Sequence, residues 1–265
     1  MTEKLKISVN NVTKIFESKR QNITALLDVS MSVREGEFVS LVGPSGCGKS
    51  TVIRIIENII PPTNGSVTID GVTYTDRIPS DILRKLGFVF QAHNLLPWMT
   101  VEQNLRLPLK AFGLKGDKWD DQVEMLLSFS KLTNMRNVYT NELSVGMQQR
   151  LGVVRALVHD PEILLMDEPF GALDALTRDE LDIQLLDICE KTHKTVIFIT
   201  HSVAESVLLS DRVYVMKTNP GEIIGEVRIG LPKPRSLDMK DSREFAEYEY
   251  KIIDAIGNLE LSSIK

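Results

Sequence analysis

Residues 43–51, which read Gly-Pro-Ser-Gly-Cys-Gly-Lys-Ser-Thr, constrain the fold of this chain more than any other segment. Their spacing fits the pattern G-x-x-x-x-G-K-S/T, in which glycines let successive backbone N–H groups curl around phosphate oxygens at the start of a helix. The apolar residues 37–42 precede this segment as a strand, and the isoleucine-rich residues 50–60 follow it at helical spacing. This order predicts a phosphate-binding loop within an α/β fold.

The loop predicts a nucleotide site and a role for each of its two functional side chains. Lys49 is expected to hold the β- and γ-phosphates, and the Ser50 hydroxyl to bind Mg²⁺. A chance match to the pattern is expected in roughly one chain in a hundred of this length, and the flanking strand and helix make chance a poorer account. The residues predicted to surround the phosphates are Gly43, Pro44, Ser45, Gly46, Cys47, Gly48, Lys49, Ser50 and Thr51.

A second group of candidate residues stands at the ends of two other apolar strands. Asp167 and Glu168 follow residues 163–166, where a buried acidic pair is costly unless it binds something. Asp167 is expected to orient the metal shell, and Glu168 to act as a general base on water, a role worth about 10²–10⁴ in rate. His201 follows residues 195–199 at the same sheet edge, where it suits a γ-phosphate contact. Taken singly, the acidic pair is also compatible with a solvated strand end, and the histidine with a structural role.

The order of the predicted elements indicates one α/β domain over residues 1–265. Strands alternating with helices predict a largely parallel sheet covered by helices. Residues 5–12 have the alternation of an edge strand, and residues 101–132 have a helical pattern that predicts an inserted lobe. The other expected elements are short strands at 67–70, 87–90, 213–216 and 223–227, a helix at 175–191, and an amphipathic helical tail at about 236–265.

Composition excludes several classes of protein. With 43% hydrophobic and 25% charged residues the chain is an ordinary globular protein, and its net charge of −5 argues against nucleic acid as a partner. Its longest apolar runs fall far short of the roughly 20 residues that a spanning helix needs, and residues 1–5 have no apolar signal region. We therefore expect contact with a membrane only through a partner. Cys47 and Cys189 are expected to be reduced structural thiols.

Residues 143–150, Leu-Ser-Val-Gly-Met-Gln-Gln-Arg, lie between the phosphate loop and the acidic strand. This signature segment, Gln91, the D-loop at residues 171–174 and His201 occur in the order found in the nucleotide-binding subunits of ABC transporters, which the chain resembles from about residue 5 to 235. The resemblance implies a P-loop NTPase core, with a mixed, largely parallel sheet and an antiparallel β edge. It also implies an α-helical subdomain inserted at about 92–160, and ATP and Mg²⁺ as cofactors.

The family resemblance also implies partners and further site residues. Two copies pack head to tail, so that Ser144, Gly146 and Gln148 act on the ATP held by the other copy. Gln91 joins the Mg²⁺ site of Ser50 and Asp167 to the helical subdomain and takes part in catalysis with Lys49, Glu168 and His201. Phe16 is expected to stack on adenine. Transmembrane permease subunits are direct partners at the cytoplasmic face of the membrane, and an extracytoplasmic solute-binding protein is an indirect one.

Secondary motifs resemble one importer subfamily. Residues 95–98, 219–221 and 231–235, together with the Met-Gln-Gln-Arg of the signature segment, resemble importers of nitrate, sulfonate and taurine. The solute itself is selected by the membrane subunits and the binding protein, so the chain indicates only a class. After residue 235 there is length for about one helix, and we expect no C-terminal regulatory domain.

Val145 stands where the family signature has glycine, and a β-branched residue there is strained if the backbone needs a positive φ. We hypothesise that closure of the dimer is weakened but not lost. One alternative function is a non-transport ABC ATPase acting on ribosomes or DNA, and another is a module that holds ATP without hydrolysing it. The 51 residues between Gln91 and Leu143 leave room only for a helical lobe, which disfavours the first; Glu168 and His201 argue against the second.

Overall fold

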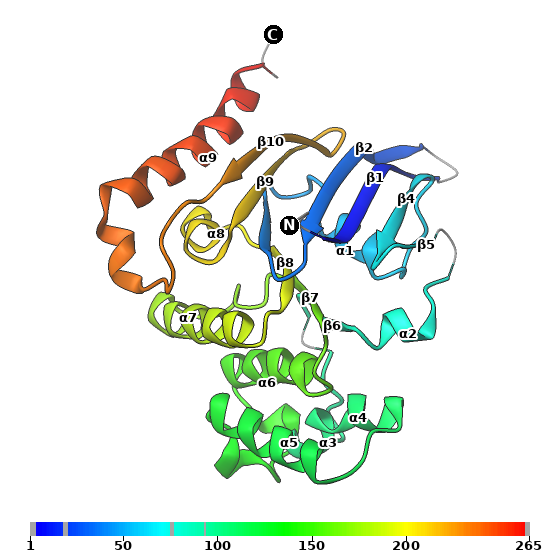
Figure 1. The fold of residues 1–265 in the computed structure, drawn as a ribbon, viewed down its shortest axis with the longest axis vertical. Helices are drawn as coiled ribbons and strands as arrows, with labels where there is room; N and C mark the ends of the chain where they lie inside the picture. The colour runs from blue at the N-terminus through cyan, green and yellow to red at the C-terminus, as the bar shows by residue number, and fades with distance from the viewer. Residues whose placement is uncertain (1–3, 18–20, 75–76, 93, 263–265) are drawn as a thin grey trace.

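A computed structural model describes residues 4–17, 21–74, 77–92 and 94–262. Its central sheet has the strand order β10-β9-β3-β8-β7-β6 (Figure 1). Strands β3, β6, β7, β8 and β9 of this sheet are mutually parallel, whereas β10 is antiparallel to β9. The strands are β3 (Phe38–Val42), β6 (Leu86–Val89), β7 (Ile163–Asp167), β8 (Thr195–Ile199), β9 (Arg212–Lys217) and β10 (Glu222–Arg228). All residues of β3, β7 and β8 are buried, because elements cover both faces of a parallel sheet.

A second, antiparallel sheet has the order β2-β1-β4-β5. Its strands are β1 (Leu5–Phe16), β2 (Ile23–Arg34), β4 (Asn64–Ile69) and β5 (Val72–Tyr74). The expectation of an edge strand at residues 5–12 is wrong, because β1 pairs with β2 on one side and β4 on the other. Its alternation reflects one buried face, which includes Ile7 and Val9, and one face toward solvent. The two sheets together confirm the expected mixed fold with an antiparallel part.

Helix α1 (Lys49–Ile56) contacts strands of both sheets, namely β2, β7 and β8. It is shorter than the predicted 50–60, because Glu57 is its C-cap and Asn58 adopts the left-handed conformation with φ 57°. Its apolar face, which includes Ile53 and Ile56, is buried in one core between the sheets. The helix therefore fixes the phosphate loop, which immediately precedes it, to both sheets.

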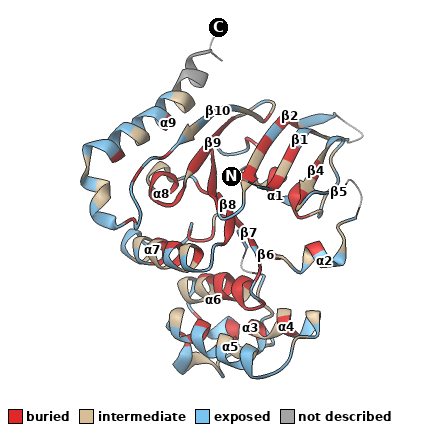
Figure 2. Cartoon of the chain, viewed as in Figure 1, coloured by how far each residue is buried: buried red, intermediate tan, exposed pale blue. Residues whose placement is uncertain are grey.

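The other face of the central sheet is covered by α7 (Ala175–Lys191), α8 (Val203–Leu209) and α9 (Arg243–Ser262). The short helix η3 (Leu237–Asp241) precedes α9. Phe245 and Ile252 of α9 pack into a core with α8 and β9. Figure 2 shows the burial that results, with red strands at the centre and a largely exposed outer face on α9. The predicted tail at 236–265 includes residues 263–265, which lie outside the described residues. Among the described residues, no helix is both long and apolar enough to span a bilayer.

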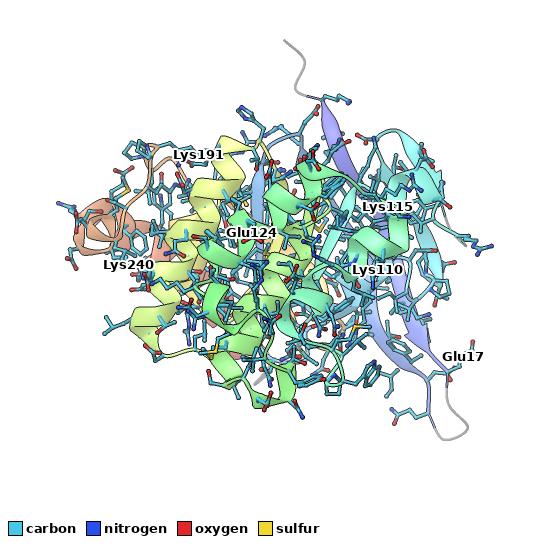
Figure 3. All side chains as sticks on the ribbon, turned by 90° about the horizontal axis from the view of Figure 1, so that it is seen from below. Glu17, Lys110, Lys115, Glu124, Lys191 and Lys240 are labelled. Atoms are coloured by element: carbon cyan, nitrogen blue, oxygen red, sulfur yellow. The ribbon has the colours of Figure 1, made fainter. Side chains whose placement is uncertain are left out.

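Helices between residues 101 and 157 form a separate group at one end of the molecule (Figures 1 and 3). Figure 3 looks onto this end, where Lys110, Lys115 and Glu124 lie. Buried residues such as Leu127 and Leu151 join this group to Leu164 and Phe198 of the sheet in one core. The elements are α3 (Val101–Leu105), α4 (Leu107–Phe112), α5 (Asp117–Phe129), η1 (Thr133–Met135), η2 (Thr140–Glu142) and α6 (Val145–Leu157); the short α2 (Ser80–Leu83) precedes β6.

Candidate active site

The phosphate loop joins the carboxyl end of β3 to the start of α1, and its glycines have backbone conformations that other residues rarely adopt. Gly43, Gly46 and Gly48 have φ of 153°, 79° and 94°. A Cβ atom at Gly43 would lie 2.4 Å from the Met216 carbonyl oxygen, and one at Gly48 would lie 2.5 Å from Leu26 Cδ2. The spacing of glycines in the sequence pattern is therefore required by close packing as well as by backbone freedom.

Lys49 is 5% exposed, and its ammonium group folds back over the loop. Its Nζ donates hydrogen bonds to the carbonyl oxygens of Gly43 at 2.8 Å and Pro44 at 3.2 Å. These partners are neutral, and the nearest charge to act on the ammonium is that of Asp167, at longer range. An incoming phosphate oxygen can take up the charge of the ammonium with a stronger, charge-assisted hydrogen bond.

The Ser50 hydroxyl donates a hydrogen bond to Asp167 Oδ1 at 3.1 Å, which joins the start of α1 to the end of β7. Asp167 is only 7% exposed, and this burial raises the pKa of its carboxyl, with the Ser50 hydrogen bond opposing the rise and the charge of Glu168 adding to it. A hydroxyl and a carboxylate are the hard oxygen ligands that Mg²⁺ prefers, and such sites commonly use few protein ligands beside phosphate and water. The pair therefore fits Mg²⁺, which would offset the cost of burying the carboxylate.

Glu168 meets two predicted partners at the sheet edge. Its Oε1 lies 2.6 Å from His201 Nε2, and its Oε2 accepts a hydrogen bond of 3.3 Å from Gln91 Nε2. Gln91 follows β6, Glu168 follows β7 and His201 follows β8. Because these strands are parallel, their carboxyl ends bring the three residues together. Glu168 has a φ of 49°, and its N–H donates to Ile199 at 3.0 Å. Non-glycine residues held in this conformation occur preferentially at functional sites.

These residues surround one open cavity of about 310 Å³. Ser45, Gly46, Gly48, Lys49, Ser50, Thr51, Gln91, Glu168 and His201 line it. The buried Asp167 lies behind Ser50, and Cys47 is buried and free, like Cys189. Most of the predicted phosphate and catalytic residues thus converge on one space. Phe16, Ser144, Gly146 and Gln148 do not line that cavity.

The signature segment is held by contacts within its own chain. Ser144 caps α6 and accepts a hydrogen bond from the Met147 N–H at 3.3 Å, while Gln148 Nε2 donates to the Thr140 carbonyl oxygen at 2.8 Å. A Cβ atom at Gly146 would lie 2.9 Å from Leu173 Cδ2, so this glycine allows the segment to pack against the D-loop. Ser144 remains exposed at the start of the helix, where N–H groups favour an anion.

The backbone at Val145 does not have the positive φ that would strain a valine. Val145 is the first residue of α6 and is absent from the residues with positive φ, so valine adopts its backbone conformation without penalty. Its side chain is 55% exposed beside Ser144. Any effect of valine on closure must therefore come from the bulk of its side chain and not from backbone strain.

Phe16 is the last residue of β1, and its ring is 42% exposed. Lys14 Nζ lies 5.2 Å from the ring centroid, within the range of a cation–π contact. The exposed ring is compatible with stacking on a base, which stays a prediction.

Sequence reasoning missed three polar residues beside this site and one, Glu57, at the C-terminal end of α1. Arg178, Thr200 and Glu205 line a second cavity of about 130 Å³ that also touches Glu168 and His201. Glu57 is 5% exposed, and burial, with the charge of Asp167 added, raises its pKa to about 8. A lone acidic residue among isoleucines was a signal for Glu57. The other three depend on tertiary contacts that no local pattern shows.

Together, the phosphate loop, the Ser50–Asp167 pair and the Glu168–His201 pair are the features of a P-loop nucleoside triphosphatase. The family profile described as ABC transporter matches residues 26–171, and the chain belongs to this family. This confirms the resemblance drawn from the signature segment.

Relatives of known sequence match the chain over most of its length. An uncharacterized ABC transporter ATP-binding protein of Methanocaldococcus jannaschii is 43% identical, with 99% of this chain and 95% of that protein covered. The aliphatic sulfonates import ATP-binding protein SsuB of Bacillus cereus is 40% identical, with 93% and 94% covered. The nitrate import ATP-binding protein NrtD of Synechocystis is 38% identical, with 93% of each chain covered.

Solved structures agree with the fold. The dimeric structure of MJ0796, a bacterial ABC transporter cassette, matches with a TM-score of 0.77 and 36% identity, covering 85% of this chain and 100% of that one. A post-hydrolysis state of the same cassette bound to ADP and phosphate matches equally well. The chain is thus an ATP-binding ABC transporter subunit and an ATPase.

Proposed function

We propose that this chain is the ATPase subunit of an importer, in which two copies drive uptake of a small solute of the nitrate, sulfonate or taurine class through permease subunits. The sulfonate and nitrate import proteins among its relatives support the solute class. The secondary motifs at residues 95–98, 219–221 and 231–235 agree with this class.

The single observation that carries the catalytic assignment is the contact of 2.6 Å between Glu168 Oε1 and His201 Nε2 at the wall of the cavity that also holds Lys49. Glu168 accepts the proton of the attacking water, and His201 orients its carboxylate. Lys49 and the loop N–H groups hold the β- and γ-phosphates. Mg²⁺ held by Ser50, Asp167 and Gln91 would neutralise phosphate charge.

A second copy completes the site in this proposal. Ser144, Gly146 and Gln148 lie outside the cavity of their own chain, and the exposed start of α6 is suited to bind a phosphate of the other copy. The dimeric cassette structure supports this arrangement. Closure around two ATP molecules, and its release by hydrolysis, then move the attached membrane subunits between two access states.

Partners and location follow from the same proposal. We divide the chain into a nucleotide-binding core and a helical subdomain at about 92–160, with a helical tail from about 236. Gln91 directly precedes the helical subdomain, so a change at Glu168 reaches the part of the chain expected to contact the permease. The chain is then a peripheral protein on the cytoplasmic face of the membrane, and a solute-binding protein acts on the far side.

Replacing Glu168 by Gln tests the catalytic assignment. The Glu168→Gln chain should bind ATP with unchanged affinity and lose at least about 10²-fold in hydrolysis, because the amide accepts no proton. ATPase assays and nucleotide-binding titrations measure the two quantities. Glu247→Gln, an exposed glutamate on α9, is the control and should keep full activity. Hydrolysis at the original rate in Glu168→Gln would remove Glu168 as the base.

Reconstitution of the chain with its permease in vesicles tests the transport assignment. Uptake of nitrate, taurine or an alkanesulfonate that requires ATP and an intact Glu168 is the expected result. Hydrolysis stimulated by ribosomes or DNA, with no uptake of any of the three, would favour a non-transport ATPase instead.

A further inference from the structure

A cavity of about 130 Å³ lies beside the catalytic pair and is distinct from the nucleotide cavity. Two chain segments form it: the one that runs from Glu168 through the D-loop into α7, and the turn between β8 and α8. Glu168, Pro169, Phe170, Gly171, Arg178, Thr200, His201, Ser202 and Glu205 line it. Arg178 and Glu205 reach across this cavity and connect the two segments.

Arg178 on α7 makes contacts with both segments. Its guanidinium donates a hydrogen bond to the Leu173 carbonyl oxygen of the D-loop at 2.8 Å. Its Nε also lies 3.4 Å from Glu205 Oε1 on α8, and the side chains of Arg178 and Glu205 are 29% and 8% exposed. One side chain therefore ties the D-loop to the helix that follows His201.

Glu205 in turn fixes the residue that precedes His201. Its Oε2 accepts a hydrogen bond from the Thr200 hydroxyl, and that same hydroxyl oxygen accepts the Ser202 N–H at 2.9 Å. Burial raises the pKa of Glu205, and the contacts with Thr200 and Arg178 oppose this rise. The turn that carries His201 is thus held by polar contacts on both sides of the histidine.

We propose that Arg178 and Glu205 are positioning residues that couple the D-loop to the orientation of His201, and through it to Glu168. The contacts run from the D-loop carbonyl through Arg178 and Glu205 to the Thr200 hydroxyl, and the backbone then continues from Thr200 into His201 and its contact of 2.6 Å with Glu168. This inference rests on the proposed function, because it assigns Arg178 and Glu205 to the same reaction.

The series of contacts begins at Leu173, which packs against the signature segment. Leu173, whose carbonyl oxygen Arg178 holds, packs beside Gly146. A displacement of the signature segment on binding the other copy's ATP therefore acts on the anchor of Arg178. The geometry links the event at the dimer face to the carboxylate that activates water in the same chain.

Kinetics of Arg178→Ala and Glu205→Gln test the proposal. Each change should lower kcat about tenfold or more, because the base loses its fixed orientation, while the affinity for a non-hydrolysable ATP analogue stays within about twofold. The double variant should be no slower than the slower single one, since both residues act through the same contact. Arg178→Lys should recover part of the rate, because lysine keeps the charge beside Glu205 but has no fork to reach the Leu173 carbonyl as well.

A matched pair on the opposite edge of the sheet separates positioning from general stability. Arg212 pairs with Glu37 at 2.9 Å and is buried, but it is remote from the cavity. Arg212→Lys should lower the melting temperature without changing kcat, whereas Arg178→Lys should change kcat. Parallel losses of kcat, analogue affinity and melting temperature in Arg178→Ala, or an unchanged kcat, would overturn the proposal. Full activity of Glu168→Gln would instead overturn the proposed function.

Discussion

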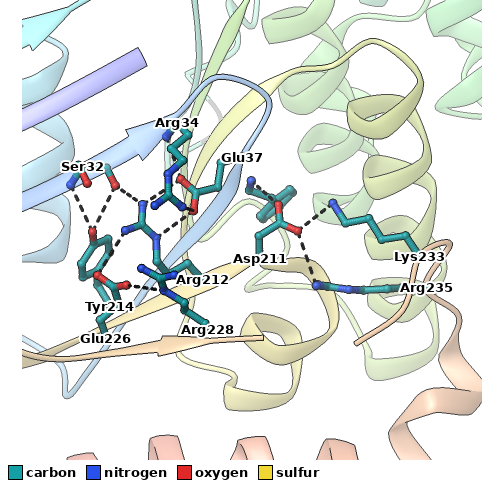
Figure 4. A network of polar contacts seen from close by, with 11 residues as sticks. Ser32, Arg34, Glu37, Asp211, Arg212, Tyr214, Glu226, Arg228, Lys233 and Arg235 are labelled. Atoms are coloured by element: carbon teal, nitrogen blue, oxygen red, sulfur yellow. Dashed lines mark hydrogen bonds and ion pairs between the residues drawn. The ribbon is translucent and has the colours of Figure 1, made fainter. Parts of the chain in front are cut away.

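Charged side chains have different partners at the two ends of the central sheet, where its parallel strands begin and where they finish. At the edge where the strands begin, Arg212 donates to both carboxylate oxygens of Glu37 at 2.9 Å, and Asp211 pairs with Lys233 at 2.8 Å (Figure 4). Each buried charge there has an opposite charge within the same chain.

At the end of the sheet where the strands finish, Glu168 lies 2.6 Å from His201 Nε2, but among the described residues Lys49 and Asp167 have no oppositely charged group at ion-pair distance. The ammonium of Lys49 bonds to carbonyl oxygens, and the buried Asp167 accepts a hydrogen bond from a neutral hydroxyl while its pKa is raised. Groups left in this state gain most from a ligand that brings phosphate charge and a cation. The ion pairs at the starts of the strands therefore stabilise the fold, whereas Lys49 and Asp167 at the strand ends would be stabilised by a bound nucleotide and its cation.

Removing a charge from the nucleotide edge should affect activity far more than stability. Lys49→Met keeps most of the side-chain volume, and we expect it to lower hydrolysis at least about 100-fold by removing the phosphate clamp. The free energy of unfolding without nucleotide should change little, because the ammonium makes hydrogen bonds only to neutral groups and attracts Asp167 only at longer range. Activity assays and denaturant titrations check both. Lys115→Met, on the exposed helical end, is the control, and an active Lys49→Met chain would contradict the assignment.

Removing a charge from the opposite edge should give the reverse result. Arg212→Gln removes the two hydrogen bonds to the buried Glu37 and leaves it only the more distant Arg34 guanidinium at 3.8 Å, which should lower the free energy of unfolding by about 3 kcal/mol. Below its melting temperature the variant should hydrolyse ATP at the original rate per folded molecule. Denaturant titration measures the loss, and Arg212→Met combined with Glu37→Gln should recover much of it. A single variant as stable as the original would mean that the pair does not stabilise this edge.

Glu57, the buried acidic residue at the C-terminal end of α1, gives a test through pH. Its pKa rises from the ordinary 4.5 to about 8 on folding, so the folded chain keeps a proton that the unfolded chain releases as pH increases. The unfolding free energy of the nucleotide-free protein should therefore fall by up to about 1.4 kcal/mol per pH unit from Glu57 alone as pH rises through this window. Glu57→Gln should remove this dependence and be more stable at pH 7 by about 3 kcal/mol. Identical pH profiles of the two proteins would contradict the shift.

Val145→Gly should have the smallest effect. Removing the exposed side chain at the start of α6 should raise the ATPase rate by about twofold if its bulk hinders closure, at a cost of up to about 1 kcal/mol of helix stability. Val145→Ala separates the two effects, because alanine removes bulk and favours the helix. An unchanged or lower rate in both variants counts against the hypothesis.

Site residues that belong to a local sequence pattern were predictable from the sequence. The glycine spacing, and the polar residues at the ends of apolar strands, place Lys49, Asp167, Glu168 and His201 correctly at one edge, because parallel strands align their carboxyl ends. Strand β2 was missed: Asp28 has a φ of 52°, and the pairing with β1 shifts register along its length, which breaks the period of two that identifies a strand.

Features that depend on neighbours were not predictable. The sequence of β1 alternates in the same way whether one strand or two lie beside it, so its place inside the sheet was out of reach. Glycine in the family signature suggested a positive φ at Val145, but the backbone there is helical. The pairing of Arg178 with Glu205 joins helices 27 residues apart in sequence and leaves no periodic trace.

The close packing of Gly146 against Leu173 has a genetic consequence under the proposed dimer. A larger residue at Gly146 would disturb the signature offered to the other copy and, through the D-loop, the hydrolytic machinery of its own copy. In a cell producing both altered and ordinary chains, a mixed dimer would then be impaired at both of its ATP sites, although only one subunit carries the change. A lesion at this glycine should therefore behave as a dominant allele.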